Sequence, residues 1–240
     1  MKVIIIGATS GIGRETAKLY IARGWKVGVA GRREAELESL RLEAPEQVLT
    51  QVIDVTKEDA PQQLQALIGQ MGGMDVFLLS SGIGKQNYAL QPDIELATAA
   101  TNVEGFIRMT IAAYHYFEKQ GHGQLAVISS IAGTKGLGAA AAYSATKRFQ
   151  HNYIDALDQL ARMNKLNISF TDIRPGFVAT PLLKDDSYPL LMKAPEVAAH
   201  IVRAIDKKKR VATIDWKYRL LVGFWRLIPR WLWVRLPVRN

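Results

Sequence analysis

Near the start of the sequence, Val3-Ile-Ile-Ile6 is followed directly by Gly7-Ala-Thr-Ser-Gly11-Ile-Gly13. The apolar run predicts a buried strand, and the glycine turn opens a helix whose unpaired N–H groups and dipole attract a pyrophosphate. Gly7 allows a tight turn, Gly11 lets a ligand approach the backbone, and Gly13 lets helix and strand pack closely. An ordinary strand-to-helix loop has a similar appearance. The residues that we expect at this dinucleotide site are Gly7, Thr9, Ser10, Gly11, Ile12 and Gly13.

Beyond this motif, apolar runs rich in Val and Ile alternate with amphipathic stretches as far as residue 214. The alternation predicts one domain, residues 1–214, with an α/β fold: a doubly wound, mainly parallel seven-stranded sheet with helices on both faces. The expected strands are residues 2–6, 26–30, 48–52, 75–80, 124–129, 168–173 and 211–214. The expected helices are 12–23, 33–42, 61–71, 94–118 with a break near Thr101, 141–163 and 195–204.

The composition excludes several kinds of site. The 240 residues include no cysteine, so neither a disulfide nor a thiolate metal site can form, and the four histidines show no ligand spacing. We therefore expect no metal. The apolar run at residues 3–6 is too short for a signal peptide, and no stretch reaches the roughly 18 uncharged apolar residues of a spanning helix. We expect a cytoplasmic protein.

The second expected strand ends in Ala30-Gly31-Arg32-Arg33, where an NAD site usually has an acid that binds the ribose 2′-hydroxyl. A guanidinium suits a 2′-phosphate, so Arg32 and Arg33 indicate NADP(H) as the cofactor. Alternatively, Arg32 and Arg33 are simply charged residues at the exposed start of the next helix. Asp54-Val55, after the third strand, can place a carboxylate beside the adenine amino group, although Asp is also a common turn residue.

The fifth expected strand is followed by Ser130, and Tyr143 lies thirteen residues further on, four residues before Lys147. Positions i and i+4 share a face of a helix, so the phenol and the ammonium are neighbours. The lysine charge favours the phenolate, which suits a tyrosine that exchanges a proton near neutral pH, and Ser130 can hydrogen-bond a substrate oxygen. Alternatively, Tyr143 is a packed ring and Lys147 a solvated charge.

Together with Pro175-Gly-Phe-Val-Ala-Thr180, these motifs resemble the short-chain dehydrogenase/reductase family over residues 1–214. The resemblance implies a Rossmann-like fold, a homodimer or homotetramer, and hydride transfer between a nicotinamide and a carbonyl or alcohol carbon. It also implies that Asn102 supports, through a water, a proton path ending at Lys147. The implied catalytic set is Asn102, Ser130, Tyr143 and Lys147. Further cofactor contacts implied by the family are Ser81, Gly82, Tyr143, Lys147, Pro175, Gly176, Val178 and Thr180.

Two positions depart from the family's pattern. The family usually has Asn-Asn-Ala-Gly after the fourth strand, whereas this chain has Leu79-Ser-Ser-Gly82. A serine hydroxyl at position 80 offers one donor where an amide offers two, so we expect the sheet to be braced differently there. Ile6 stands where the family commonly has Thr, which also bears on bracing and not on chemistry.

The segment 180–195 falls where the family places its substrate lid, and it is rich in apolar residues. These apolar residues either bind an apolar substrate or pack against the protein's own core or a partner. The apolar residues of this segment are Leu182, Leu183, Tyr188, Pro189, Leu190, Leu191 and Met192.

The C-terminal tail, residues 215–240, is basic and rich in tryptophan. Residues 206–240 contain ten Lys or Arg against two Asp, so they carry +8 of the net +9 charge. Pro229 separates two short predicted helices, the first with one broad apolar side and a strip containing Arg219, Gly223 and Arg226 opposite it. This pattern is typical of a helix on an anionic membrane surface, but a subunit interface or a lid over the active site would also produce it. The apolar side consists of Trp216, Leu220, Leu221, Phe224, Trp225, Leu227 and Ile228.

The sequence thus predicts an NADP(H)-dependent oxidoreductase that interconverts a carbonyl and an alcohol, acting as a reductase of an apolar, lipid-like substrate. The alternative is a non-catalytic NADP(H)-binding redox sensor or membrane-associated regulatory protein. Nucleic-acid binding through the basic tail has no recognised motif to support it, and we expect none.

Overall fold

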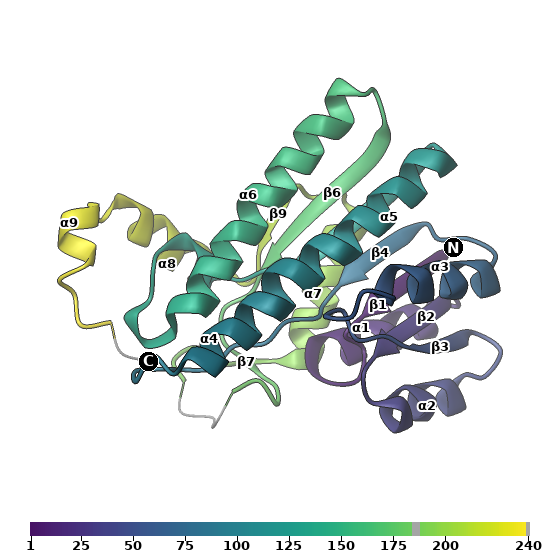
Figure 1. The fold of residues 1–240 in the computed structure, drawn as a ribbon, viewed down its shortest axis with the longest axis horizontal. Coiled ribbons are helices and arrows are strands. Elements are labelled where there is room, and N and C mark those ends of the chain that lie inside the picture. Colours follow the sequence, from purple (N-terminus) through teal and green to yellow (C-terminus); the bar gives the residue numbers. More distant parts are fainter. Residues whose placement is uncertain (184–187, 239–240) are drawn as a thin grey trace.

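Seven parallel strands form a single sheet in the order β3-β2-β1-β4-β5-β6-β9 (Figure 1). The computed structural model describes residues 1–183 and 188–238. The predicted fold class is confirmed, and each expected strand is present with bounds shifted by at most two residues. The strands are β1 (Lys2–Ile6), β2 (Lys26–Gly31), β3 (Val48–Val52), β4 (Val76–Leu79), β5 (His122–Ile128), β6 (Asn167–Arg174) and β9 (Val211–Thr213).

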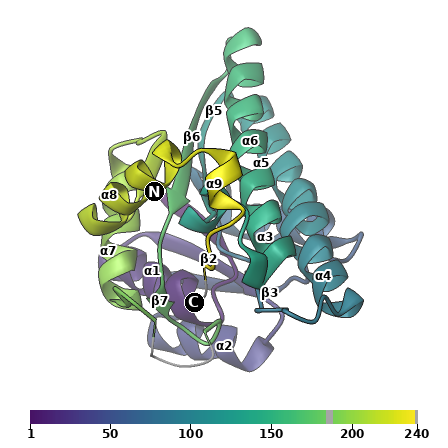
Figure 2. The same ribbon diagram turned by 90° about the vertical axis from the view of Figure 1, so that its left-hand side faces the viewer.

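Helices cover both faces of the sheet, because side chains alternate along each strand and both faces must be buried. Ile4 and Ile6 of β1 pack toward α3, α5 and α6, whereas Val3 and Ile5 pack toward α1, α2 and α7. Figures 1 and 2 show the two layers with the sheet between them. The helices are α1 (Gly11–Ala22), α2 (Glu34–Glu43), α3 (Ala60–Met71), α4 (Pro92–Ala99), α5 (Phe106–Gln120), α6 (Ala141–Met163) and α7 (Ala194–Asp206).

The strand order reverses at β1, which pairs with β2 on one side and β4 on the other. The connections from these strands therefore leave in opposite directions and open a crevice beyond their carboxyl ends, which is where open α/β sheets bind ligands. The glycine turn after β1 lies at this point.

The expected break near Thr101 is a π-helical turn, Ala100–Gly105, between α4 and α5. The π-turn carries Asn102, which is fully buried. Glycine at position 105 lets this turn lie against the backbone that follows β3, since a Cβ there would be 3.0 Å from the Val55 carbonyl oxygen. A widened turn of this kind re-aims a side chain within a helix and is frequent at functional sites.

Three smaller features complete the fold at the carboxyl ends of the strands. A short parallel pair, β7 (Val178–Ala179) and β8 (Met192–Lys193), was not expected from the sequence. Between these strands, residues 184–187 of the expected 180–195 loop lie outside the described residues. Two tail helices, α8 (Trp216–Leu227) and α9 (Arg230–Trp233), lie on either side of Pro229 as expected (Figure 2).

Candidate active site

A cavity of about 830 Å³ lies at the carboxyl ends of the strands. It brings together most of the residues singled out in the sequence, although they come from seven separate stretches of chain. Two expected residues, Gly13 and Asn102, are not part of its wall. The expected residues that line it are Gly7, Thr9, Ser10, Gly11, Ile12, Arg32, Arg33, Asp54, Val55, Ser81, Gly82, Ser130, Tyr143, Lys147, Pro175, Gly176, Val178 and Thr180.

The glycine turn forms one end of the cavity. Gly7 has a φ of +92°, and a Cβ there would be 2.7 Å from the backbone nitrogen of Ser81. A Cβ at Gly13 would be 2.3 Å from the carbonyl oxygen of Gly7, so Gly13 serves packing and not ligand contact. The side chain of Ser10 does not cap α1, which leaves the first N–H groups of the helix available to an anion. This cradle fits the pyrophosphate of a dinucleotide.

Positive charge borders the same end of the cavity. Arg32 and Arg33 are exposed, and the Arg33 guanidinium donates to the Thr9 hydroxyl at 2.9 Å (Nη2 to Oγ1). Burial acts to raise the pKa of Asp54, but hydrogen bonds from Thr56 and the nearby charge of Arg32 outweigh it and lower that pKa. The arginines therefore have room and charge for an added phosphate.

Ser130 and Tyr143 meet in the middle of the cavity wall. Ser130 follows β5, and its Oγ accepts a hydrogen bond from the Ala132 nitrogen at 3.1 Å, which fixes the turn after the strand. Burial raises the pKa of the Tyr143 phenol, and interaction with the Ser130 hydroxyl only partly offsets this. The Lys147 Nζ lies 5.7 Å from the centre of the ring, and burial dominates, so the net shift of the Tyr143 pKa is upward and not downward as expected from the sequence.

Lys147 is buried and is held by oxygen acceptors on two elements. Its Nζ donates to the Ile128 carbonyl oxygen at 3.1 Å and to Oε1 of Gln150 at 3.0 Å. Burial lowers the pKa of this ammonium to about 8, while the negative charge of Asp172 acts in the opposite direction. The lysine is thus still largely charged near neutral pH but close to losing its proton.

Gln150 links Lys147 to Asn102, a role that the sequence interpretation missed. Its Nε2 donates to the Asn102 carbonyl oxygen at 2.9 Å, while its Oε1 accepts from Lys147. Besides the water that the family resemblance implies on the path from Asn102 to Lys147, the side-chain amide of Gln150 joins these two residues. Gln150 lies three residues after Lys147 on α6, a spacing that places the two on one helix face and was the available signal.

The side chain of Asn102 braces the cofactor end. Its Oδ1 accepts from the Ile83 nitrogen at 2.9 Å, and its Nδ2 donates to the Ile83 carbonyl oxygen at 2.7 Å. A second donation from Nδ2 reaches the Thr146 hydroxyl at 3.1 Å. Asn102 therefore fixes the loop after β4 relative to α6 from behind the cavity, and it does not cap a helix.

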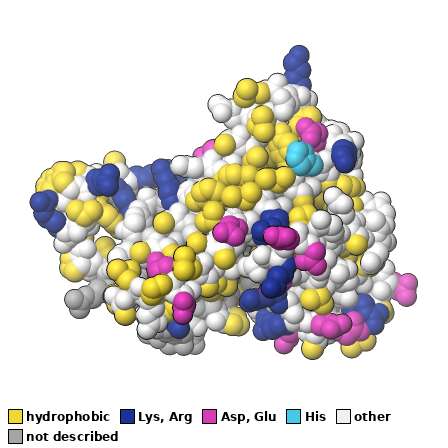
Figure 3. Space-filling view, in the orientation of Figure 1, with side chains coloured by type: hydrophobic (Ala, Val, Ile, Leu, Met, Phe, Trp, Pro, Cys, Tyr) yellow, Lys and Arg dark blue, Asp and Glu magenta, His cyan; other side chains and the backbone are white. Residues whose placement is uncertain are grey.

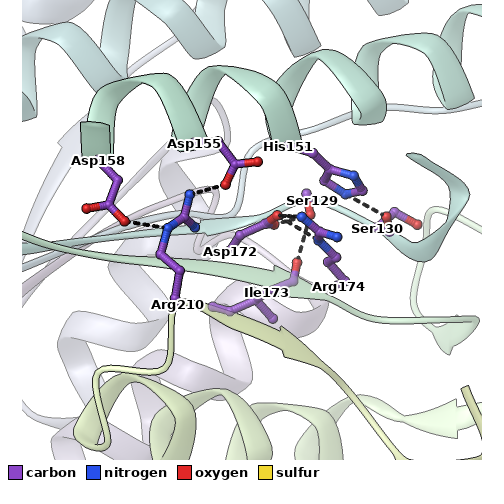
Figure 4. Close-up of polar contacts among 9 residues, drawn as sticks. All are labelled: Ser129, Ser130, His151, Asp155, Asp158, Asp172, Ile173, Arg174 and Arg210. Atoms are coloured by element: carbon purple, nitrogen blue, oxygen red, sulfur yellow. Dashed lines mark hydrogen bonds and ion pairs between the residues drawn. The ribbon is translucent and has the colours of Figure 1, made fainter. Parts of the chain in front are cut away.

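A buried polar cluster lies behind Ser130 (Figure 4). Asp172 accepts a hydrogen bond from the Ser129 hydroxyl. It also forms an ion pair with Arg174, whose Nε lies 2.7 Å from Oδ2 of Asp172. His151 Nε2 contacts the Ser130 carbonyl oxygen at 3.0 Å, and its Nδ1 has no hydrogen-bond partner among the described residues. Burial lowers the pKa of His151 to about 4, and the positive charge of Arg174 adds to this against the effect of Asp172. His151 is therefore neutral and holds the backbone that carries Ser130.

The tail supplies part of the cavity wall, which agrees with the alternative of a lid over the active site. Tyr218, Leu221 and Trp225 of α8 line the cavity. The broad apolar side expected for this helix is therefore divided, because Leu220, Phe224 and Leu227 of the same side are exposed. The Tyr218 ring packs on Gly176, where a Cβ would be 2.1 Å from it, and its hydroxyl accepts from the Phe177 nitrogen at 3.1 Å. Gly176 therefore makes room for the tail as well as lining the cavity.

No set of three or more His, Asp or Glu side chains is arranged to hold a metal ion in residues 1–183 and 188–238. None of the helices in the described part of the chain is long and apolar enough to cross a membrane.

Comparison with known proteins identifies the family. The model of the short chain dehydrogenase family matches residues 1–189. An uncharacterized oxidoreductase of Myxococcus xanthus is 30% identical over 234 residues, covering 94% of this chain and 92% of that protein. Dehydrogenase/reductase SDR family member 7B of Xenopus tropicalis is 27% identical over 235 residues, covering 87% of this chain and 75% of that protein.

Solved structures with the same fold include two reductases. A 3-ketoacyl-(acyl-carrier-protein) reductase from Brucella melitensis, complexed with NADH, has a TM-score of 0.79 at 25% identity and covers 89% of this chain and 96% of its own. An actinorhodin polyketide ketoreductase with NADPH has a TM-score of 0.77 at 24% identity, covering 89% and 95% of the two chains.

The buried, neutral His151 makes stability depend on pH. Its pKa is about 4 in the folded protein against 6.5 for a free histidine, so the unfolded chain binds more protons between these values. The free energy of unfolding should fall as pH drops from about 6.5 to 4, by up to roughly 3 kcal/mol from this residue. Urea unfolding across this range should show a shallower decline for His151→Gln.

The matched control is His115→Gln, since His115 is exposed on α5. This variant should keep the pH dependence of the natural chain. An identical decline in the natural protein and His151→Gln would contradict the assignment of a buried neutral histidine.

Proposed function

Because the chain belongs to the short-chain dehydrogenase family, we propose that it is an NADPH-dependent reductase that converts the carbonyl group of an apolar, lipid-like substrate to an alcohol. The observation that carries this proposal is the single cavity shared by the glycine turn, Ser130, Tyr143 and Lys147. A cofactor cradle and a proton-exchanging group open into one space, as a reductase requires.

The protonation states suit reduction. When bound, NADPH supplies a hydride for the carbonyl carbon. Ser130 holds the carbonyl oxygen, and Tyr143, whose raised pKa keeps the phenol protonated, donates its proton to that oxygen to complete the alcohol. The ammonium of Lys147 stabilises the phenolate that remains, and Gln150 and the Ile128 carbonyl fix its position.

The preference for NADPH rests on charge. Arg32 and Arg33 follow β2 at the edge of the cavity, and the acid that would bind a ribose 2′-hydroxyl is absent there. The similar structures contain either NADH or NADPH, so the preference is argued from these arginines alone.

The proposal of an apolar substrate rests on the apolar side chains in the half of the cavity wall away from the glycine turn. Beyond Tyr143, the wall consists mainly of side chains from the loop before α6, from residues 177–183 and 188–190, and from α8. Such a surface binds hydrocarbon and leaves the carbonyl as the one polar group to be held by Ser130 and Tyr143. The apolar residues of this half are Leu137, Phe177, Leu182, Leu183, Leu190, Leu221 and Trp225.

We further propose that residues 1–214 form the oxidoreductase domain and work as a homodimer or homotetramer in the cytoplasm, with residues 215–240 on the inner face of a membrane. Exposed apolar side chains on α5 and α6, such as Ile111 and Leu160, support the contact between subunits.

Turnover tests the reductase. The purified protein should consume NADPH with long-chain ketones, and Tyr143→Phe should lower kcat by at least about a hundredfold because it removes the proton donor. Fluorescence titration should show that this variant still binds NADPH. NADPH binding without turnover of any carbonyl compound would favour the redox-sensor alternative, and failure to bind either cofactor would refute the proposal.

The relative affinity for NADPH and NADH tests the role proposed for Arg32. Arg32→Ala should weaken NADPH binding by about tenfold to a hundredfold while NADH binding changes little, because only NADPH carries the 2′-phosphate. Fluorescence titration with both cofactors measures the two affinities. Arg41→Ala, an arginine of α2 paired with Glu38, is the control and should bind both normally. If the natural chain bound NADH more tightly than NADPH, the assignment of Arg32 to the 2′-phosphate would be contradicted.

The pH profile tests the Lys147–Gln150 contact. Reduction should decline above about pH 8 as Lys147 loses its charge. Gln150→Leu removes an acceptor of the ammonium, so the pKa of Lys147 should fall further and the decline should move to lower pH. The measurement is kcat/KM against pH, with the exposed Gln159→Leu on the same helix as control. An unmoved or upward-shifted decline in Gln150→Leu would show that the contact does not set this pKa.

A further inference from the structure

Helix α8 is apolar on two opposite faces. Tyr218, Leu221 and Trp225 recur at helical spacing and face the cavity. The outer face is exposed to solvent: Leu220, Phe224 and Leu227 are 66%, 65% and 79% exposed. Burial of the inner face accounts for the helix, but nothing in residues 1–183 and 188–238 covers the large apolar side chains on its outer face.

The outer apolar surface continues beyond α8 and is flanked by positive charge. Trp216 at the start of α8, and Trp231 and Val234 at α9, are 58%, 63% and 70% exposed. Figure 3 shows Lys and Arg side chains beside hydrophobic ones at the left end of the molecule, where Figure 1 places α8 and α9. None of the tail cations forms an ion pair with a residue that the structure describes. These cations are Lys217, Arg219, Arg226, Arg230 and Arg235.

A second cavity, of about 360 Å³, adjoins the start of α8. Trp216 forms part of its wall, so it meets the outer apolar surface directly. Among the described residues that line it, the one acid is Asp215, which caps α8 by accepting from the Lys217 nitrogen at 2.8 Å. The cavity is therefore a basic pocket of a size suited to a phosphate-bearing group. The cationic and titratable residues that line it are His200, Arg203, Lys207, Lys209 and Arg219.

We propose that the outer face of α8 and α9, together with this basic pocket, docks on a bilayer containing anionic phospholipids. A lipid phosphate occupies the pocket, Trp216 lies at the depth of the headgroups, and Leu220, Phe224 and Leu227 enter the acyl region. The tail cations add attraction to the anionic surface.

Charge complementarity favours a lipid surface over a second copy of the chain. A two-fold contact through this face would place the same unpaired cations of both copies together, which costs electrostatic energy. Nucleic acid would satisfy the cations but would leave exposed leucine, phenylalanine and tryptophan side chains in water.

The two faces of α8 connect the membrane with the reacting centre. The helix that lies on the bilayer is also a wall of the substrate cavity, whose rim includes Leu182 and Leu190, 44% and 47% exposed. A membrane-dissolved carbonyl compound thus reaches Tyr143 along apolar surface. This last step rests on the proposed function, whereas the docking itself does not.

The test is co-sedimentation of the full chain, without cofactor or substrate, with vesicles of phosphatidylcholine alone or mixed with phosphatidylglycerol. We expect binding to the mixed vesicles, weakened by added salt, with a blue shift of tryptophan emission. Leu220→Glu should reduce the bound fraction by roughly tenfold or more. Leu42→Glu, a leucine of α2 that is 67% exposed, is the matched control and should bind normally.

A second pair of variants tests the basic pocket. Arg203→Ala with Lys207→Ala should weaken binding to mixed vesicles more than Lys119→Ala with Arg162→Ala, which removes the same charge elsewhere on the surface. Equal loss in both pairs would leave no role for the pocket and overturn that part of the proposal.

Three results would overturn docking on a bilayer: equal binding of Leu220→Glu and Leu42→Glu, sedimentation showing that Leu220→Glu dissociates a dimer of the natural chain, or retention on DNA in place of vesicles. Turnover of a short, water-soluble ketone by Leu220→Glu checks that the variant is folded. Vesicle binding by a protein without reductase activity would refute the proposed function and leave the docking surface standing.

Discussion

A buried ammonium is the constraint on which the reacting centre depends. Lys147 is 4% exposed, and a charge taken out of water must be matched by nearby acceptors or give up its proton. The Ile128 carbonyl and the Gln150 amide supply two acceptors, and Asp172 supplies a negative charge further away. The end of β5, one face of α6 and the π-helical turn are thereby tied to one another. A displacement of any of them would change the acceptors that surround this ammonium.

The layer behind the cavity keeps this arrangement rigid. His151, neutral because it is buried, contacts the backbone of Ser130, while Asp172 binds Ser129 and Arg174. Arg210 joins the chain before β9 to α6 through Asp158, with 2.7 Å between Nε and Oδ2 (Figure 4). His151, Asp172, Arg174, Asp158 and Arg210 do not line the cavity, yet they fix the strand ends and the helix from which Ser130, Tyr143 and Lys147 project.

The tail is a structural part of the site. Trp233 of α9 donates from Nε1 to the Gly136 carbonyl oxygen at 2.7 Å, and Lys135 donates to the Ile228 carbonyl oxygen at 2.8 Å. The segment between Ser130 and α6 therefore has the tail packed on it. A change in what covers the outer face of α8 would be transmitted to the cavity by these contacts and by Tyr218.

The sequence alone determined the features that depend on short-range pattern. Alternating apolar runs and amphipathic stretches fixed the α/β class, because strand and helix periodicities are local properties. The glycine turn and the pair Tyr143 and Lys147 were readable for the same reason, since four residues are one turn of a helix. Tertiary structure alone decided that Gln150 joins Lys147 to Asn102, 48 residues away, and that burial raises the pKa of Tyr143. It also decided that α8 turns Leu221 and Trp225 inward, because a helix with two apolar faces does not reveal which one the fold will cover.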